Sequence, residues 1–258
     1  MNEISLEERK EIGLKILEEL DMICQKHNIP YYIAYGTLIG AVRHQGFIPW
    51  DDDIDVWIPS EYYNSLLEIL DIESQYEVIN HHKEDSWIRS FSKLSNNKTI
   101  IIDKDKNSIN RLQRERGIAI DLFPIYPISR KYCCYRIMNI YHSLIVKDFI
   151  KAHGGEIRKR DEICIKVLGG VSKIKRKRNA LEQNKKRSKY VGCVLTPYGL
   201  NDIHFKSEFE SIKLEFCGRL FNAPKGYDAI LTRIYGNYMK LPPKDKQISH
   251  HTVDAYWK

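Results

Sequence analysis

The sequence lacks any long uninterrupted apolar run. Its most apolar stretch, from Ile137 to Ile150, is broken by His142, Lys147 and Asp148 well before the roughly 20 residues that a membrane-spanning helix needs. Charged residues occur throughout the first 30 positions, which therefore do not resemble a signal peptide. We predict neither a transmembrane segment nor a signal peptide, and we expect a cytosolic protein.

Paired metal-binding cysteines are also missing. The six cysteines include no C-x-x-C pair, and no histidine is spaced to complete a zinc site with them. We interpret them as reduced thiols of a cytosolic chain. Internal repeats and low-complexity segments are absent, as are the RNP, zinc-finger and helix-turn-helix signatures. Nucleic-acid binding is therefore not expected as the main role.

What is present is the composition of a soluble globular protein. The 258 residues are 43% hydrophobic and 29% charged, and one domain is enough to account for them. The formal net charge of +7 suits nucleic acid, an anionic membrane face or phosphorylated substrates, and charge alone does not choose between them. Nine Lys or Arg lie between residues 173 and 189. This basic segment fits a solvated helical face, and it also fits attraction to a phosphate-rich acceptor or an anionic membrane.

The apolar patterns predict helices and short strands in irregular order. Expected helices are 6–27, one starting near 36, and 61–70; expected strands are 31–35, 53–58, several between 77 and 103, and 117–123, the last stopped by Pro124 and Pro127. Because no regular βαβ repeat appears, we predict an α+β fold with a small mixed sheet and flanking helices. Residues 1–130 would form the catalytic core with the metal site, and residues 131–258 a mostly helical region for the acceptor, within one domain.

Four acidic residues stand within five positions, at Asp51, Asp52, Asp53 and Asp55. Like charges so close repel each other unless a cation lies among them. On a strand, Asp53 and Asp55 would share one face, where their oxygens could bind Mg²⁺ or Mn²⁺. A solvated acidic turn is the alternative, but the flanking Trp50 and the apolar residues 56–58 argue against full exposure.

A third carboxylate is expected at Asp121. It lies inside the otherwise apolar segment GIAIDLFPI, where an unpaired charge would be costly to bury. Two-metal phosphoryl transfer needs several anionic oxygens, so Asp121 is the best candidate for a further metal ligand. An ion pair with an Arg or Lys would satisfy the same residue.

Phosphate contacts are expected upstream and downstream of the acidic cluster. Gly36 and Thr37 end a predicted strand and open a helix, where backbone N–H groups and the helix dipole favour anions. Arg43 is a candidate phosphate contact between them and Asp53. Lys93 could serve the same purpose from another strand, although a surface lysine is the alternative.

Three segments resemble conserved blocks of the LicD family. The first is YGTLIGAVRHQGFIPWDDDIDVWIP at 35–59, the second GIAIDLFPI at 117–125, and the third FNAPKGYDAILTRIYGNYMKLPP at 221–243. The family includes bacterial phosphocholine transferases and is related to fukutin and fukutin-related ribitol-phosphate transferases, within the nucleotidyltransferase superfamily. The resemblance implies a nucleotidyltransferase-like fold and a metal role for Asp53, Asp55 and Asp121.

The resemblance further implies transfer of a phosphorylated alcohol, classically phosphocholine, from a CDP-activated donor to a hydroxyl of a cell-surface glycan. Such acceptors include precursors of lipopolysaccharide, teichoic acid and capsule. Asp52, Tyr235 and His250 are then expected at the substrate site, and Tyr235 would belong to an aromatic wall whose alternative role is plain packing. The zinc-binding insertion of the fukutin-related branch has no counterpart here. The head group, the acceptor and the identity of the base stay open.

Two other functions are compatible with the same residues. A nucleotidyltransferase that moves the nucleotide itself onto a hydroxyl would use the same metal site but release pyrophosphate. A non-catalytic protein could use its basic surface to bind an anionic glycan. The intact aspartates argue against the second alternative, because a binding protein does not need such costly carboxylates.

Overall fold

The computed structural model describes residues 2–80, 87, 89–103, 116–128, 132–183, 188–193, 197–248 and 253–258. It begins with α1 (Leu6–Lys26), which confirms the helix predicted for 6–27. Ser5 and Glu8 form a capping box at its start, so two backbone N–H groups at this end are paired. The apolar stripe of α1, including Ile16, Leu17 and Leu20, is fully buried.

The centre of the molecule is a mixed sheet, which confirms the predicted α+β class. Its strands are β1 (Tyr32–Ile33), β2 (Asp55–Pro59), β6 (Ala119–Ile128), β4 (Ser92–Ser95) and β3 (Glu77–Ile79), in that order, with β7 (Tyr190–Gly192) pairing β6 and β8 (Ile203–Phe205). Among the strands that the structure describes in this sheet, only β2 and β6 are parallel. Two further antiparallel pairs are β9 (Ser211–Phe216) with β10 (Arg219–Pro224), and β5 (Thr99–Asp103) with β11 (Val253–Trp257).

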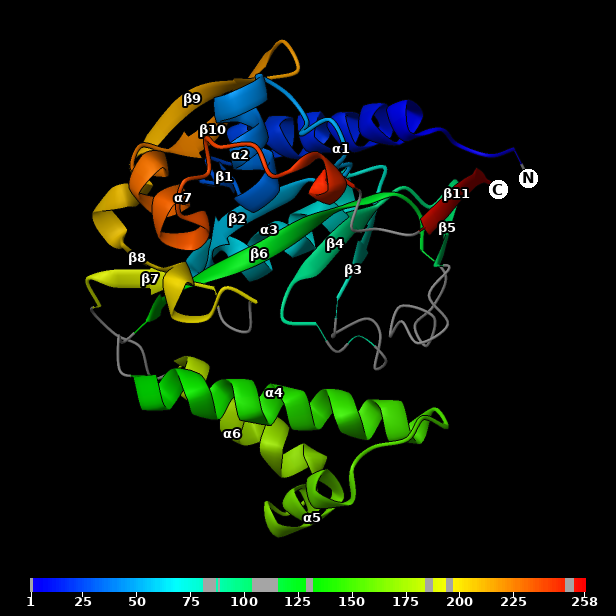
Figure 1. The fold of residues 1–258 in the computed structure, drawn as a ribbon, viewed down its shortest axis with the longest axis vertical. Coiled ribbons are helices and arrows are strands. Elements are labelled where there is room, and N and C mark those ends of the chain that lie inside the picture. Colours follow the sequence, from blue (N-terminus) through cyan, green and yellow to red (C-terminus); the bar gives the residue numbers. More distant parts are fainter. Residues whose placement is uncertain are drawn as a thin grey trace.

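Helices cover this sheet from several sides (Figure 1). The remaining ones are α2 (Tyr35–His44), α3 (Ser60–Glu73), α4 (Tyr132–Ala152), α5 (Lys159–Val167), α6 (Val171–Gln183) and α7 (Tyr227–Tyr235), with short 3₁₀ turns η2 (Gly199–Asp202), η3 (Lys206–Phe209) and η4 (Lys244–Lys246). α1 and α3 contact each other and β6, while α2 contacts β2, β9 and α7. No helix in the described part of the chain is long and apolar enough to cross a membrane.

The prediction that Pro124 and Pro127 stop a strand was wrong, because β6 continues through both to Ile128. The amide of Asp121 donates to the carbonyl of Ile54, just before β2, so the nitrogen of Pro124 faces the opposite edge of β6. On that edge β4 reaches only as far as Ser92, the partner of Leu122, and does not extend to Pro124. β2 in turn ends opposite Ile125, before Pro127. Neither proline therefore leaves a ladder hydrogen bond unmade on these neighbours.

The helical region ends sooner than predicted. α4, α5 and α6 fill 132–183, but the described residues after 188 form five strands and only one α-helix. The expectation of a mostly helical 131–258 therefore holds only for its first part. The periodicity after residue 188 is two rather than 3.6 in the pairs β7–β8 and β9–β10, as the alternating burial of β9 shows.

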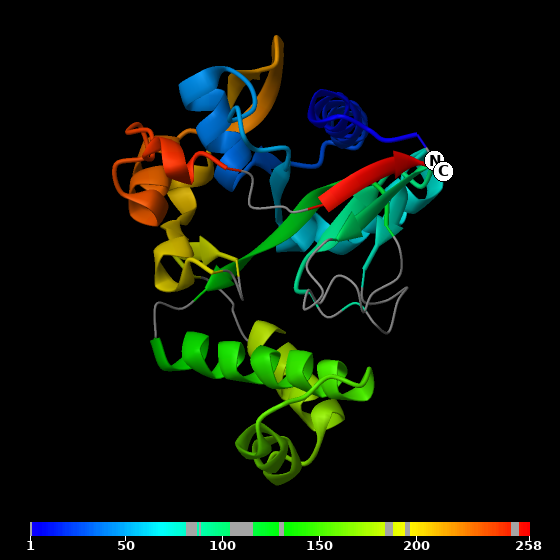
Figure 2. The same ribbon diagram turned by 45° about the vertical axis from the view of Figure 1, so that its right-hand side comes forward.

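α4, α5 and α6 have a small apolar core of their own. Its buried residues are Leu144, Ile145, Ile165 and Ile174, separate from the main core under the sheet. Both views show these three helices as a layer set off from the sheet, with α5 farthest from it (Figures 1 and 2). α4 contacts η2, which connects this layer to the rest of the molecule.

α2 approaches the loop that follows it closely at Gly40 and Gly46. A Cβ at Gly40 would lie 2.3 Å from the carbonyl oxygen of Gly46, so backbone would have to move. We expect Gly40→Ala to lower the free energy of unfolding by about 1–3 kcal/mol. Gly13→Ala is the matched control, because its Cβ would meet only the side-chain end of Ile54, at 3.3 Å.

The helix propensity of alanine offsets the small adjustment at Gly13, so that variant should stay within about 1 kcal/mol of the wild type. Urea denaturation of both variants measures the difference. Equal effects at the two positions would contradict the tight contact at Gly40.

Candidate active site

The sheet register brings a cation and two carboxylates into one row. Asp55 of β2 is the parallel partner of Asp121 in β6, and Asp121 is the antiparallel partner of Lys93 in β4. Residues paired across neighbouring strands project to the same face, so the three side chains lie side by side. Asp55 and Lys93 are 38 residues apart in sequence, and Lys93 and Asp121 are 28 apart. The pairing of β6 with both β2 and β4 brings the three together.

Asp121 forms an ion pair with Lys93. Both side chains are about one-fifth exposed, at 20% and 21%, so Lys93 is not a plain surface lysine. The alternative that a Lys satisfies Asp121 is therefore observed. It does not remove the excess of negative charge, because one ammonium serves two adjacent carboxylates.

The pKa of the Asp55 carboxyl is raised well above its ordinary value. Burial is the largest cause, followed by the negative charges of Asp121, Asp53 and Asp51, and Lys93 only partly opposes them. An aspartate in this environment is stabilised in its charged form by additional positive charge. The row thus has the electrostatic character of a site for a divalent cation.

The start of α2 adjoins this row. The backbone N–H of Asp55 donates to Oγ1 of Thr37 at 2.8 Å, which fixes the beginning of β2 against the first turn of the helix. Gly36 lies beside Asp51, whose Oδ2 would be 3.1 Å from a Cβ at that position. The N-cap residue, Ala34, provides no side-chain cap. Gly36 and Thr37 therefore lie where they were predicted, at a helix start suited to an anion.

The other acidic residues of the cluster take different positions. β2 begins at Asp55, so the prediction that Asp53 lies in the strand was wrong; Asp53 is exposed in the segment before it. The reason is that the pairing with β6 begins at Ile54, whose carbonyl accepts from the amide of Asp121, so Asp53 precedes the ladder. Asp52 forms an ion pair with Arg9 of α1 at 2.9 Å, and this interaction directs it toward that helix.

No three His, Cys, Asp or Glu side chains within the described ranges are arranged around a single metal position. Asp55 and Asp121 are instead a pair, with Asp53 close enough to raise the pKa of Asp55. A pair of carboxylates is sufficient for Mg²⁺ when substrate phosphates and water supply the remaining oxygens.

Two predicted contacts are not brought to the row. Arg43 lies in the last turn of α2, about two turns from Thr37, and donates to the carbonyl of Tyr238 at 2.6 Å and to the ring of His44 at 2.9 Å. It connects α2 to the segment after α7. His250 lies outside the described residues.

An aromatic row adjoins the charged one. Trp57 and Phe123 are register partners two residues beyond Asp55 and Asp121, and hence on the same face. Tyr35 packs edge-on against both rings and stacks on Tyr198 with 5.2 Å between centroids. Sequence analysis did not identify Tyr198, because its chain neighbours carry no motif.

Tyr235, predicted at the substrate site, extends this row. Its hydroxyl donates to that of Tyr198 at 2.8 Å. Burial raises the pKa of both phenols, and the charge of Asp55 contributes to each increase, so both rings lie near the acidic row. Tyr235 therefore belongs to an aromatic cluster near the acidic row, and its partners Tyr198 and Tyr35 come from other segments of the chain.

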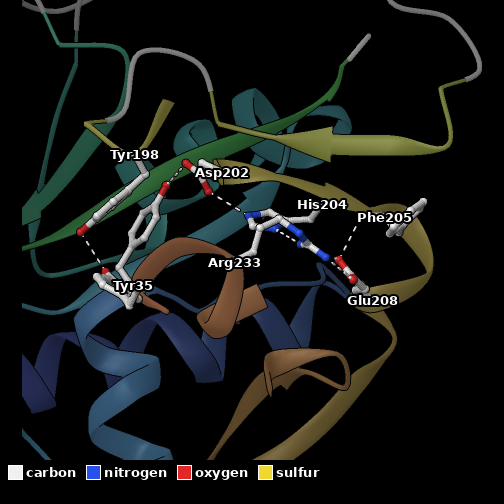
Figure 3. Close-up of polar contacts among 8 residues, drawn as sticks. Tyr35, Tyr198, Asp202, His204, Phe205, Glu208 and Arg233 are labelled. Atoms are coloured by element: carbon white, nitrogen blue, oxygen red, sulfur yellow. Dashed lines mark hydrogen bonds and ion pairs between the residues drawn. The ribbon is translucent and has the colours of Figure 1, made fainter. Parts of the chain in front are cut away.

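A chain of polar side chains that begins at Tyr35 supports the aromatic row (Figure 3). The Tyr35 hydroxyl donates to Asp202 at 2.6 Å, Asp202 accepts from Nε2 of His204 at 2.9 Å, and Arg233 donates to Nδ1 of His204 at 2.7 Å. Arg233 also pairs with Glu208 at 2.7 Å. Because an arginine can only donate, Nδ1 of His204 must accept, and the ring is neutral with its proton on Nε2.

Sequence analysis missed this chain. Asp202 and His204 are both completely buried, yet they stand two residues apart in the short segment NDIHF. A pair of polar residues alternating with apolar ones in a short strand was the available signal.

Comparisons with known proteins identify the family of the chain. Residues 28–147 match the family model described as LicD/FKTN/FKRP, nucleotidyltransferase domain. The chain is 30% identical over 272 aligned positions to the lipopolysaccharide cholinephosphotransferase LicD of Haemophilus influenzae, with 99% of each chain covered. Shorter matches occur to uncharacterised proteins of Rickettsia prowazekii (36% identical, 36% of this chain and 34% of the relative) and Rickettsia typhi (46% identical, 22% and 18%).

The raised pKa of Asp55 predicts a stability change of unusual sign. In the folded state this carboxyl keeps its proton at pH values where the unfolded chain has lost it, so folding becomes less favourable as pH rises from the ordinary aspartate value toward the folded one. Without divalent cations, Asp55→Asn should therefore have a higher melting temperature than the wild type above neutral pH. The difference should shrink toward about pH 4.

Asp52→Asn is the matched control, and it should lower the melting temperature because it leaves Arg9 without its ion-pair partner. Scanning calorimetry with EDTA at both pH values measures all three proteins. An Asp55→Asn protein that melts below the wild type at alkaline pH would contradict the electrostatic assignment.

Loss of the Tyr35 hydroxyl should destabilise the fold. Tyr35→Phe removes a donor from the completely buried Asp202, and we expect the free energy of unfolding to fall by about 1–3 kcal/mol. Tyr235→Phe removes a hydrogen bond between two partly exposed hydroxyls, so its cost should be about 0.5–1.5 kcal/mol. Chemical denaturation measures the free energy of unfolding of both variants. A larger loss in Tyr235→Phe than in Tyr35→Phe would refute the role of the polar chain.

Proposed function

Because the chain belongs to the LicD family, we propose that it catalyses metal-dependent transfer of phosphocholine, or a similar phosphorylated alcohol, from a CDP-activated donor to a hydroxyl of a cell-surface glycan. Family membership rests on 30% identity across 99% of the chain, and it makes the protein a phosphotransferase. Precursors of lipopolysaccharide are the first acceptors to test, with teichoic acid and capsule precursors next. The reaction takes place in the cytoplasm.

The observation that carries the proposal is the row of Asp55, Asp121 and Lys93 beside the uncapped start of α2. Carboxylates that share one ammonium favour a divalent cation, and a helix N-terminus favours a phosphate. A CDP-alcohol suits both features, because its anionic diphosphate binds a divalent cation and also presents phosphate oxygens to a helix N-terminus. The two features adjoin through the hydrogen bond between Thr37 and the amide of Asp55.

The residues fit Mg²⁺ or Mn²⁺, which Asp55 and Asp121 would hold with a contribution from Asp53. The raised pKa of Asp55 supports this fit, since the carboxylates lack sufficient positive charge of their own. When bound, such cations neutralise the diphosphate and stabilise the departing CMP.

The chain's own groups would orient the reaction and accept a proton. The acceptor oxygen forms a bond to the phosphorus of the phospho-alcohol while the bond from that phosphorus to the CMP oxygen breaks, and CMP leaves with the electron pair. Asp55 or Asp121 takes the hydroxyl proton. Lys93, held by Asp121, provides a fixed positive charge beside the reacting phosphoryl group.

The aromatic row supports a cationic head group. A quaternary ammonium binds the faces of aromatic rings, and Tyr198, Tyr235 and Phe123 are partly exposed next to the acidic row. Ribitol or glycerol would gain nothing from such rings. Choline is therefore the head group that these side chains favour.

The competing reaction is transfer of the nucleotide itself, which would release pyrophosphate in place of CMP. The test incubates the purified protein with Mg²⁺ or Mn²⁺, an extracted glycan acceptor and a panel of CDP-alcohols, and follows both products. We expect CMP from CDP-choline, and EDTA should stop its release until the cation is restored.

Asp55→Asn and Asp121→Asn should each reduce CMP release about 100-fold or more, because each removes a charge from the reacting centre. Asp245→Asn, at an exposed position of η4, is the control and should retain wild-type activity. Pyrophosphate as the nucleotide product would favour the competing reaction. Absence of both products with every donor would favour a binding role.

A further inference from the structure

The positive charge of the protein is concentrated in the layer formed by α4, α5 and α6. Residues 132–183 contain 12 Lys or Arg and five Asp or Glu, a net charge of +7, whereas the rest of the chain contains 29 of each. The entire formal charge of the chain therefore belongs to this layer. The part that carries the candidate active site is neutral in sum.

The outer face of α5 combines basic and apolar side chains. Lys159, Arg160 and Lys166 are exposed. Between them lie Ile163, 54% exposed, and Val167, 79% exposed, spaced four residues apart and hence on one side of the helix. Two aliphatic residues this exposed and adjacent form a small apolar patch on a nine-residue helix.

The acidic residues of α5 both pair with lysines of α4. Asp161 pairs with Lys147 of α4 at 3.0 Å, and Glu162 pairs with Lys151 of α4 at 2.9 Å. The intervening turn buries Ile165 in the small core shared with α4 and α6. Two α4 lysines thus pair with both α5 carboxylates. Arg160 also lies 3.9 Å from Asp161, and Lys159 and Lys166 act on Glu162, so the outer face keeps an excess of positive charge.

α6 adds further charge to the same layer. Its Ile174 is completely buried in the small core, while Lys173, Lys175, Arg176 and Lys177 are exposed. Both ribbon views place α5 on the far side of α4 from the sheet (Figures 1 and 2). The basic and apolar face is therefore separated from the candidate active site by a layer of helix.

We propose that the outer face of α5 docks the protein on an anionic lipid bilayer, with Ile163 and Val167 entering the headgroup region and Lys159, Arg160 and Lys166 contacting lipid phosphates. Charge complementarity selects an anionic partner, and the apolar pair selects a bilayer over a soluble polyanion, which offers no apolar phase. The role of this docking surface rests on the proposed function. A lipid-linked glycan would hold its reacting hydroxyl at a distance from the bilayer, and the α4–α6 layer would hold the active site at a distance from it too.

The test is co-sedimentation of the full chain with vesicles. We expect binding to vesicles that contain phosphatidylglycerol, little binding to pure phosphatidylcholine vesicles, and release by high salt. Each basic side chain near such a surface strengthens binding roughly fivefold. Lys159→Glu with Lys166→Glu should therefore weaken binding by about 25-fold or more. Ile163→Ser with Val167→Ser should weaken it as well, because the apolar contact is lost.

Matched controls use exposed positions elsewhere. Ile72→Ser changes an 84% exposed isoleucine in α3, and Lys240→Glu with Lys244→Glu reverses two exposed charges. Both controls should bind vesicles more tightly than the α5 variant of the same type. Since all these positions are exposed, circular dichroism should show the same folded state throughout.

Several results would overturn the proposal: no binding of the wild type to anionic vesicles, equal loss in the control variants, or complete competition by soluble polyphosphate. Transfer to a water-soluble acceptor keeps the two hypotheses apart. The α5 variants should retain that transfer while Asp121→Asn loses it and still binds vesicles. Failure of docking with transfer intact refutes only the membrane surface, and failure of transfer with docking intact refutes only the enzymatic proposal.

Discussion

The parallel pairing of β2 with β6 is the interaction on which the candidate active site depends. It is the one parallel ladder described in the central sheet, and it aligns Asp55 with Asp121 and Trp57 with Phe123. A shift of one residue would direct Asp121 to the opposite face, where Ile120 and Leu122 are now buried. Burial of these apolar residues thus maintains the electrostatic arrangement, because the register cannot slip without exposing them.

This arrangement places Asp121 where its negative charge disfavours ionisation of the Asp55 carboxyl. The cost is tolerated because the surrounding structure holds the backbone firmly: Thr37 fixes the amide of Asp55, and the amide of Asp121 is bound by Ile54. A site that is electrostatically unfavourable when empty gains the most from a ligand of opposite charge. Tyr35 in the aromatic row is also in an unfavourable state, because its backbone is left-handed with φ of 43°. Its hydrogen bond to Asp202 holds it there.

The sequence predicted the fold class, the first helices and most strands before residue 130, because these follow from apolar periodicity and local turns. The five strands after residue 188 were missed. It also selected Asp55, Asp121 and Lys93, since a charge inside an apolar strand is conspicuous. It did not predict that the three are neighbours, because register depends on which strands pair. The path of β6 through two prolines was missed for the same reason, because it depends on where β4 and β2 end and on the pairing of residues 126–128 with β7. Asp202, His204 and Tyr198 were missed because their bonds to Tyr35, Arg233 and Tyr235 come from distant segments.

The polar chain behind the aromatic row has a consequence for the order in which the molecule folds. Tyr35 and Asp202 are 167 residues apart in sequence, so their hydrogen bond closes a loop that includes most of the sheet and all of α4, α5 and α6. Closing so long a loop is entropically expensive until intervening segments are already compact. The α4–α6 layer, by contrast, is built from contacts within about 50 neighbouring residues and can form early. We expect pulsed hydrogen exchange to show protection in α4 and α6 before β8, which means that a growing or refolding chain acquires its helical layer well before its active site.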